Sequence, residues 1–241
     1  MMQFDRISLG RQAKELGFVR DTFEKVYRLA DVLSYMENDR LLSNSLALKG
    51  GTAINLAVFD LPRLSVDIDM DYSKDVPREA MLLERRQISD HIQKYMTASG
   101  YILSLKTKRY HALDSFVYEY VNAGGMKDNL KIEINYMLRC HVLPVARRNI
   151  GLPWKEKDLT VLSVDPIEIF AAKSVALLNR TAARDLYDIF NLQQSGLVDE
   201  SKTTTFKNAL FSMQPLHQKP YLNILILKGS GKYRRRKSRR T

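Results

Sequence analysis

The sequence feature that most constrains the fold is the stretch 49–72, which reads KGGTAINLAVFDLPRLSVDIDMDY. Its two consecutive glycines, Gly50 and Gly51, allow a tight turn because glycine accepts backbone angles that are closed to other residues. An amphipathic segment follows the turn as far as Pro62, which ends a helix. The stretch therefore predicts a strand, a helix and a second strand, at residues 45–49, 52–59 and 66–72.

The second of these strands carries two acids, Asp67 and Asp69. Residues two apart on a strand point to the same face, so the two carboxylates project together. Adjacent carboxylates repel each other unless cations lie between them, which indicates a divalent-metal site. Backbone N–H groups at a helix N-terminus after a glycine turn attract phosphate, so the combination indicates a nucleoside triphosphate site. The alternative is a structural glycine turn followed by a solvated acidic edge strand.

This stretch resembles the first motif of the DNA polymerase β-like nucleotidyltransferase superfamily. More closely, it resembles the AbiEii-type toxin family of abortive-infection toxin–antitoxin systems, with the related MenT toxins. The positions that match the family pattern are Lys49, Gly50, Gly51, Thr52, Arg63, Ser65, Asp67 and Asp69. The resemblance implies that the two aspartates bind metal and that the other six residues bind the nucleotide. It also implies an α/β fold in which helices flank a mixed sheet, with a shortened helical C-terminal part.

A third acid, Glu133, lies on the alternating segment 130–138. The resemblance to polymerase β-like enzymes implies a third acidic residue on a strand beside the two aspartates, and Glu133 is at the expected place. Asp67, Asp69 and Glu133 together would hold two magnesium ions about 4 Å apart. One ion would activate the attacking hydroxyl, and the other would neutralise the triphosphate and the leaving pyrophosphate. The alternative is an exposed acid that pairs with Lys131.

The stretch 164–192 predicts two helices that carry the remaining candidate residues. By resemblance, Lys173 contacts the nucleotide phosphates, and an aspartate of the second helix is catalytic. We assign these roles to Lys173 and Asp185, with Asp188 as the alternative acid, and we expect Arg184 to bind the nucleotide. Read without the resemblance, the same pattern is an ordinary amphipathic pair of helices joined by salt bridges.

Two helix starts also carry a capping box, in which a capping side chain is followed three residues later by a glutamate. Asp21 and Glu24 mark the first, within a helix expected at 11–37. Asp165 and Glu168 mark the second. A further helix is expected from Pro77, at residues 77–99. Further strands are expected at residues 101–109, 115–122, 142–147 and 158–163.

Charge is concentrated at the C-terminal end of the chain. The net charge is +11, and the segment 228–241 contributes eight basic residues and no acid, which leaves +3 for the rest. The net charge of the rest of the chain is thus only weak evidence for a nucleic-acid surface. The segment reads as a disordered tail, either a basic arm for RNA or a truncated end that replaces the family's helical lobe. We expect a nucleotidyltransferase core at residues 1–164, a helical C-terminal part at 165–227 and the basic tail at 228–241.

The resemblance implies an enzyme that transfers a nucleoside monophosphate from an NTP to RNA, most plausibly to the 3′ end of tRNA. Its biological role would be that of a growth-arrest toxin with a cognate antitoxin protein. The alternatives are a small-molecule nucleotidyltransferase of the antibiotic-modifying kind and an inactive remnant that binds RNA or antitoxin. The single cysteine, Cys140, fits a reducing cytoplasm. The sequence predicts no membrane span and no signal peptide.

Overall fold

The structure is a computed structural model that describes residues 5–58, 65–150 and 159–213. It divides into two compact units, Met1–Ile169 and Phe170–Thr241, which we describe one at a time. The expected C-terminal tail and one expected nucleotide ligand, Arg63, lie outside the described residues. None of the helices in the described part combines the length and the apolar character that a membrane span needs.

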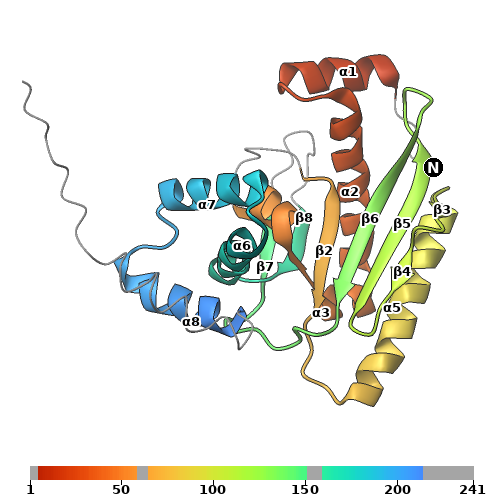
Figure 1. The fold of residues 1–241 in the computed structure, drawn as a ribbon. Coiled ribbons are helices and arrows are strands. Elements are labelled where there is room, and N and C mark those ends of the chain that lie inside the picture. The colour runs from red at the N-terminus through yellow and green to blue at the C-terminus, as the bar shows by residue number, and fades with distance from the viewer. Residues whose placement is uncertain (1–4, 59–64, 151–158, 214–241) are drawn as a thin grey trace, which may run out of the picture. The chain divides into compact units, whose positions relative to one another are not determined.

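The first unit is built on one mixed sheet (Figure 1). Its strands are β1 (Leu46–Lys49), β2 (Asp67–Tyr72), β3 (Ile102–Leu103), β4 (Lys108–Arg109), β5 (Leu113–Val121), β6 (Lys127–Asn135), β7 (Ala146–Ile150) and β8 (Leu159–Ser163). They are ordered β3-β5-β6-β2-β1-β8-β7, and β4 pairs with β5. β2 runs parallel to β6, and β1 runs parallel to β8, whereas the other pairs are antiparallel. The strands predicted around the glycine turn are confirmed as β1 and β2.

The helices of the first unit are α1 (Arg6–Glu15), α2 (Arg20–Asn38), α3 (Arg40–Ser45), α4 (Gly50–Ala53), the π-helix η1 (Ile54–Val58), α5 (Arg78–Ala98) and the beginning of α6 (Pro166–Arg180). The two long helices, α2 and α5, pack against each other. The rings of Tyr35 and Tyr95 stack with their centroids 3.9 Å apart, and the Tyr95 hydroxyl donates a hydrogen bond of 2.6 Å to Asp31.

The sheet has two different faces, because alternate residues of its central strands point to opposite sides. Phe116, Tyr118, Ile132 and Ile134 are buried on the side that faces α2 and α5. On this side, Arg28 of α2 lies over the ring of Tyr120, and Arg85 of α5 lies over the ring of Tyr136. The partly exposed residues of the other side are mostly polar. We call this side the polar face, and its central residues are Asp67, Asp69, Lys131, Glu133 and Asn135.

Of the two predicted capping boxes, only the Asp165 cap is confirmed: Asp165 precedes α6 and accepts a hydrogen bond of 2.9 Å from the N–H of Ile167. Asp21 lies inside α2, and both glutamates have tertiary partners instead. Glu24 is buried, and it accepts hydrogen bonds from Arg28 and from the backbone N–H of Ala123. Glu168 accepts instead from His141 and from the N–H of Leu143, at 3.0 and 3.1 Å.

The expected helix at 11–37 is also two helices in the structure. Gly17 separates α1 from α2 by adopting a left-handed φ of 74°. A residue with a side chain rarely adopts this angle, so the glycine marks the break between the two helices.

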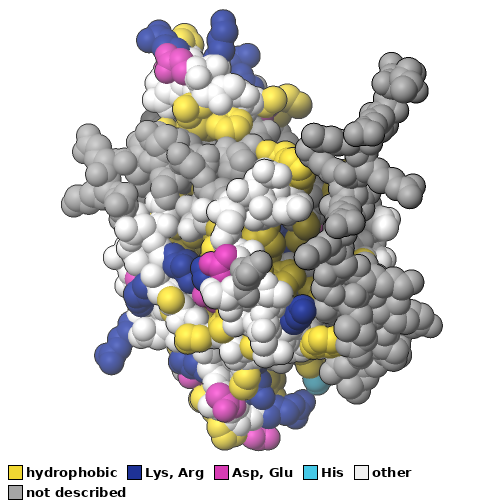
Figure 2. Space-filling view, turned by 90° about the vertical axis from the view of Figure 1, so that its left-hand side faces the viewer, with side chains coloured by type: hydrophobic (Ala, Val, Ile, Leu, Met, Phe, Trp, Pro, Cys, Tyr) yellow, Lys and Arg dark blue, Asp and Glu magenta, His cyan; other side chains and the backbone are white. Residues whose placement is uncertain are grey.

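The described part of the second unit is helical. After α6 come α7 (Ala183–Ser195), the 3₁₀ turn η2 (Glu200–Lys202) and α8 (Thr203–Met213). α6 and α8 share a small core of Ala171, Val175, Ala209 and Leu210. Large hydrophobic side chains of α6 and α7 are also exposed: Leu178, Leu186, Tyr187 and Phe190. Figure 2 shows hydrophobic side chains interspersed with charged ones over the face that it presents.

Candidate active site

The glycine turn lies directly against the first pair of acids. β1 ends at Lys49, and Gly50 then adopts a φ of 69°, a left-handed angle that favours glycine. A Cβ placed on Gly50 would lie 3.1 Å from both Cβ and Cγ of Asp69, and closer still to a carboxylate oxygen. The missing side chain therefore allows the turn to pass over the Asp69 carboxylate.

Thr52 fastens the turn to the start of β2. Its buried hydroxyl donates a hydrogen bond to the backbone carbonyl of Asp67 and lies 3.0 Å from the hydroxyl oxygen of Ser65. The side-chain amide of Asn55 donates to the carbonyl of Gly51. The structure thus brings together Thr52 and Ser65, two of the residues expected to bind the nucleotide. The Thr52 hydroxyl forms its hydrogen bonds within the protein.

Strand register places the three candidate acids on one face. Asp69 lies directly opposite Lys49 of β1 and Glu133 of β6, and Asp67 lies opposite Lys131. Residues that face each other across neighbouring strands project to the same side, and the strands are about 4.8 Å apart. The acids therefore lie on the polar face beside two lysines.

The carboxylates do not converge on a common point. Glu133 accepts hydrogen bonds from the Lys131 ammonium at 2.8 Å and from the Ser115 hydroxyl at 3.0 Å. Within the described ranges, no group of three His, Cys, Asp or Glu side chains is arranged to hold a metal ion. The ion pair with Lys131 is the contact expected from the non-catalytic alternative, although the shared face is also what a metal site needs.

Charge is concentrated in the row that Lys49, Asp69 and Glu133 form across β1, β2 and β6. Burial raises the pKa of the Asp69 carboxyl, and the charge of Glu133 raises it further, while the charge of Lys49 opposes the shift. An ionised Asp69 is therefore unfavourable unless a cation compensates it. Carboxylate oxygens are the ligands that Mg²⁺ prefers, so the donor set at this point fits a hard divalent cation.

One charged residue of the site was missed from the sequence. Asp71 is buried, and burial raises the pKa of its carboxyl, which Lys49 opposes through an ion pair of 2.5 Å. Its position two residues after Asp69 placed it on the same face and was the available signal. Asp71 therefore holds the ammonium group of Lys49 beside the acids.

The acid row opens into a cavity of about 320 Å³. It is lined by Lys49, Asp69, Met70, Ala112, Leu113, Glu133 and Asn135. Four strands, β1, β2, β5 and β6, and the residue before β5 contribute these residues. A phosphate-bearing ligand in this cavity would meet both the lysine and the carboxylates.

The candidate residues of the second unit form a buried ion cluster. Lys173 Nζ lies 3.1 Å from Asp185 and 3.1 Å from Asp188, and Arg180 donates two further hydrogen bonds to Asp185 at 2.7 and 2.9 Å. Arg184 is exposed. Burial alone raises the pKa of Asp185, but the hydrogen bonds from Arg180 and Lys173 bring it below its ordinary value.

The contacts in this cluster do not test two of the predictions. Both Asp185 and Asp188 contact Lys173, so the choice between the two acids stays open. The placement of Lys173 opposite the glycine turn stays a prediction, because the two units are described separately. Arg180 was missed, since it contacts Asp185 only after the turn between α6 and α7 brings the two helices together.

Comparison with known proteins identifies one family and one similar fold. The family model described as "Nucleotidyl transferase AbiEii toxin, Type IV TA system" matches residues 32–224. A similar solved structure is MenT4, the nucleotidyltransferase toxin Rv2826c from Mycobacterium tuberculosis H37Rv, with 19% identity and a TM-score of 0.55. The match covers 77% of this chain and 63% of MenT4, so the chain spans less than two thirds of that protein. No curated protein matches the chain.

The structural likeness concerns the fold. It confirms the prediction of a polymerase β-like fold in which helices flank a mixed sheet. The row formed by Lys49, Asp69 and Glu133 lies at the centre of that sheet, where β1, β2 and β6 adjoin.

Proposed function

Because the chain belongs to the AbiEii family of nucleotidyltransferase toxins, we propose that it transfers a nucleoside monophosphate from an NTP to RNA. The observation that carries the proposal is the row on the polar face. Two strands place Asp69 and Glu133 directly opposite each other, and the glycine turn lies against Asp69. A phosphate-binding turn and a carboxylate pair are the two parts that a metal-dependent transfer of this kind requires.

Each part of the site has a role in this reaction. Asp67, Asp69 and Glu133 would hold two Mg²⁺ ions, which supply activation of the hydroxyl and neutralisation of the phosphates. The backbone N–H groups that follow Gly50 bind phosphate oxygens. Lys49, held by Asp71, neutralises negative charge at the triphosphate.

The reaction is an in-line displacement. The acceptor hydroxyl oxygen bonds to the α-phosphorus. At the same time, the bond between the α-phosphorus and the oxygen that bridges to the β-phosphorus breaks, and pyrophosphate leaves. The proton of the hydroxyl passes to solvent. Lys173 contributes a further cation for the phosphates, held by Asp185 and Asp188, and Arg184 offers an exposed guanidinium for the same purpose.

Membership of the family supports a proposal for the acceptor and for the biological role. We propose the 3′ end of tRNA as acceptor and a cytoplasmic growth-arrest toxin as role, with a cognate antitoxin protein as partner. MenT4 is itself described as a nucleotidyltransferase toxin, which supports the toxin role.

The test measures transfer of the nucleoside monophosphate from each NTP, labelled at the α-phosphate, to total tRNA, with and without magnesium. Replacement of Asp69 with Asn removes a charge and keeps the shape, so we expect the Mg²⁺-dependent rate to fall by at least about 100-fold. Asp90→Asn, an exposed acid on α5, is the matched control and should keep the wild-type rate. Mg²⁺ should also raise the melting temperature of the wild type but not of Asp69→Asn.

Three outcomes would contradict the proposal. Undiminished transfer by Asp69→Asn would remove that carboxylate from the chemistry. Magnesium-dependent transfer to an aminoglycoside but not to RNA would favour a small-molecule enzyme. RNA binding by the wild type without transfer to any acceptor would indicate an inactive remnant.

A further inference from the structure

The polar face extends beyond the acids to the edge of the sheet. On β4, Lys108 lies directly opposite Ser115 of β5, and Ser115 lies directly opposite Glu133 of β6. Opposed residues share a face, so Lys108 projects to the same side as Glu133 and Asp69. With two strand spacings between them, the Cα atoms of Lys108 and Glu133 are about 10 Å apart.

An aromatic residue follows on the same edge. The N–H of Tyr110 donates a hydrogen bond of 2.7 Å to the carbonyl of Leu113, which continues the pairing of β4 with β5. Tyr110 follows the last residue of β4 and lies opposite Leu113 in this pairing, so we infer that its side chain lies on the polar face as well. Leu113 lies opposite Asn135, and both residues line the cavity that holds Asp69. Tyr110 as a whole residue is 53% exposed.

The segment 105–111 carries positive charge that its acidic neighbours do not cancel. It has no acid and three exposed basic side chains, Lys106, Lys108 and Arg109, of which Arg109 lies over the ring of Phe116 on the opposite face of the sheet. The nearest acids of β5 have other partners. Asp114 is buried in an ion pair with Arg85, and Glu119 accepts a hydrogen bond from Ser104. An anionic ligand at this edge therefore meets net positive charge.

The segment is held in place by a helix. Arg85 of α5 donates to the carbonyl of Tyr110 and to the carbonyl of His111, each at 2.7 Å. The same guanidinium forms two hydrogen bonds with Asp114, at 3.0 and 2.7 Å. These contacts fix the backbone on which Lys108 and Tyr110 are presented.

We propose that Lys108 and Tyr110 bind the single-stranded end of the acceptor RNA. The Lys108 ammonium contacts a backbone phosphate, and the Tyr110 ring stacks on a base near the terminal nucleotide. A cationic edge with an aromatic ring is the combination that grips single strands with little dependence on sequence. The inference rests on the proposed function, since it assigns the acceptor side of the same cavity.

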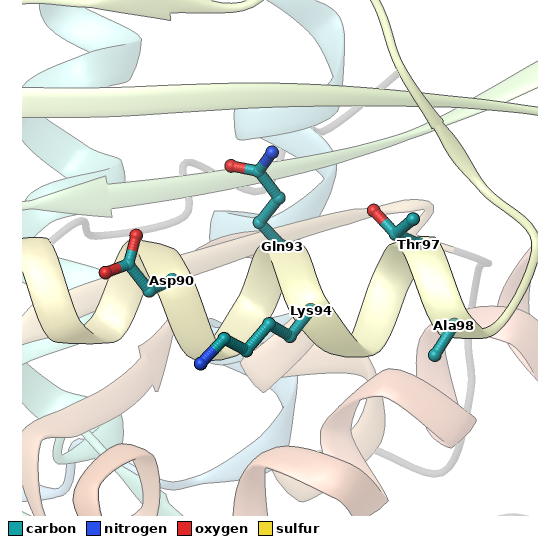
Figure 3. Close-up of a pocket in the computed structure, with 5 residues that line it drawn as sticks. All are labelled: Asp90, Gln93, Lys94, Thr97 and Ala98. Carbon is teal, nitrogen blue, oxygen red and sulfur yellow. The ribbon is translucent and has the colours of Figure 1, made fainter.

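A second hollow lacks this combination. It measures about 560 Å³ and is lined by Asp90, Gln93, Lys94, Thr97 and Ala98 of α5 (Figure 3). The close-up shows these side chains spaced along a single helix, without an aromatic ring among them. Its lysine, Lys94, is exposed like Lys108 but lies on a different element, so Lys94→Ala is a charge-matched control.

The experiment measures binding of a short fluorescent single-stranded RNA to the full chain without Mg²⁺ or NTP. We expect Tyr110→Ala to raise the Kd on the order of tenfold and Tyr110→Phe, which keeps the ring, to stay near wild type. Lys108→Ala should weaken binding several-fold and lower the salt dependence by about one phosphate contact. Lys94→Ala should leave the Kd unchanged, and no variant should alter the KM for NTP.

Failure of this inference and failure of the proposed function have different signatures. If both alanine variants bind RNA as the wild type does, or if Lys94→Ala weakens binding equally, the β4 edge is not the RNA surface. Transfer to RNA by the wild type would still stand in that case. Conversely, weakened binding by Lys108→Ala and Tyr110→Ala without transfer by the wild type would support the surface and overturn the transferase.

Discussion

Gly50 satisfies two separate constraints at one position. Its φ of 69° is unfavourable for residues with a side chain, by roughly 1–2 kcal/mol. Its missing Cβ also leaves the space in which the Asp69 carboxylate lies. The first constraint concerns stability alone, whereas the second connects the turn to the proposed metal site.

The two constraints can be separated with a pair of variants. Gly125 has a φ of 80° and no neighbour within 4 Å of an added Cβ, so Gly125→Ala reports the backbone strain alone. We expect Gly125→Ala to lose roughly 1–2 kcal/mol of stability in urea, and Gly50→Ala to lose at least as much, because the Asp69 side chain must also shift. Only Gly50→Ala should also lose the Mg²⁺-induced rise in melting temperature, because it displaces Asp69. Equal metal responses in the two variants would show that the clash is relieved without cost to the site.

At the scale of elements, α6 and α7 are joined by charge. Lys173 lies between two buried aspartates, and Arg180 compensates one of them. Removal of one partner from a buried pair leaves charge uncompensated, which costs more than loss of a surface ion pair. The cluster therefore has a structural effect whether or not Lys173 also contacts phosphate.

The pH dependence of stability should report this cluster. The pKa of Asp185 is lowered from 3.8, so its stabilising contribution is present above that pH and is lost as the pH falls through the folded-state pKa. We expect Asp185→Asn to lose on the order of 3 kcal/mol at pH 7 and progressively less below about pH 4. Chemical denaturation at several pH values measures this difference. Asp90→Asn, an exposed control on α5, should show little change, and a pH-independent loss for Asp185→Asn would exclude an ionic origin.

The elements differ in how far the sequence predicts them. The alternation around Asp69 and Glu133 reveals each strand, because side-chain direction is a local property. The parallel register that places these two residues opposite each other is not local, and only the resemblance implied it. Glu24 and Glu168 have good local capping positions but distant partners, so a local rule assigns them wrongly. Arg180 was missed because its contact with Asp185 forms only in the fold, whereas the position of Asp71 two residues after Asp69 was a local signal.

For the whole molecule, the distribution of charge separates RNA attraction from chemistry. Eight of the basic residues lie in the segment 228–241, outside the described residues, and the rest of the chain carries a net charge of +3. Attraction between a basic segment and phosphate is unspecific and depends strongly on salt.

Deletion of residues 229–241 tests this separation. The deletion should weaken binding of total tRNA at low salt and reduce the slope of log Kd against log salt. The transfer rate at saturating RNA and the preference among NTPs should not change. A filter-binding salt titration and single-turnover transfer measure the two effects. A deletion that abolishes transfer even at saturating RNA would assign the segment a part in the reaction.

The parallel pairing of β2 with β6 also affects when the site is complete during synthesis. A ribosome-bound chain that has emerged only as far as α5 already contains the glycine turn and both aspartates, but not Glu133 or its strand. Parallel strands need a long connection, so β2 waits for the intervening helix and hairpin to be made. The nascent chain therefore lacks the third carboxylate of the proposed site until β6 leaves the exit tunnel. A ribosome that stalls earlier would release a fragment without that site.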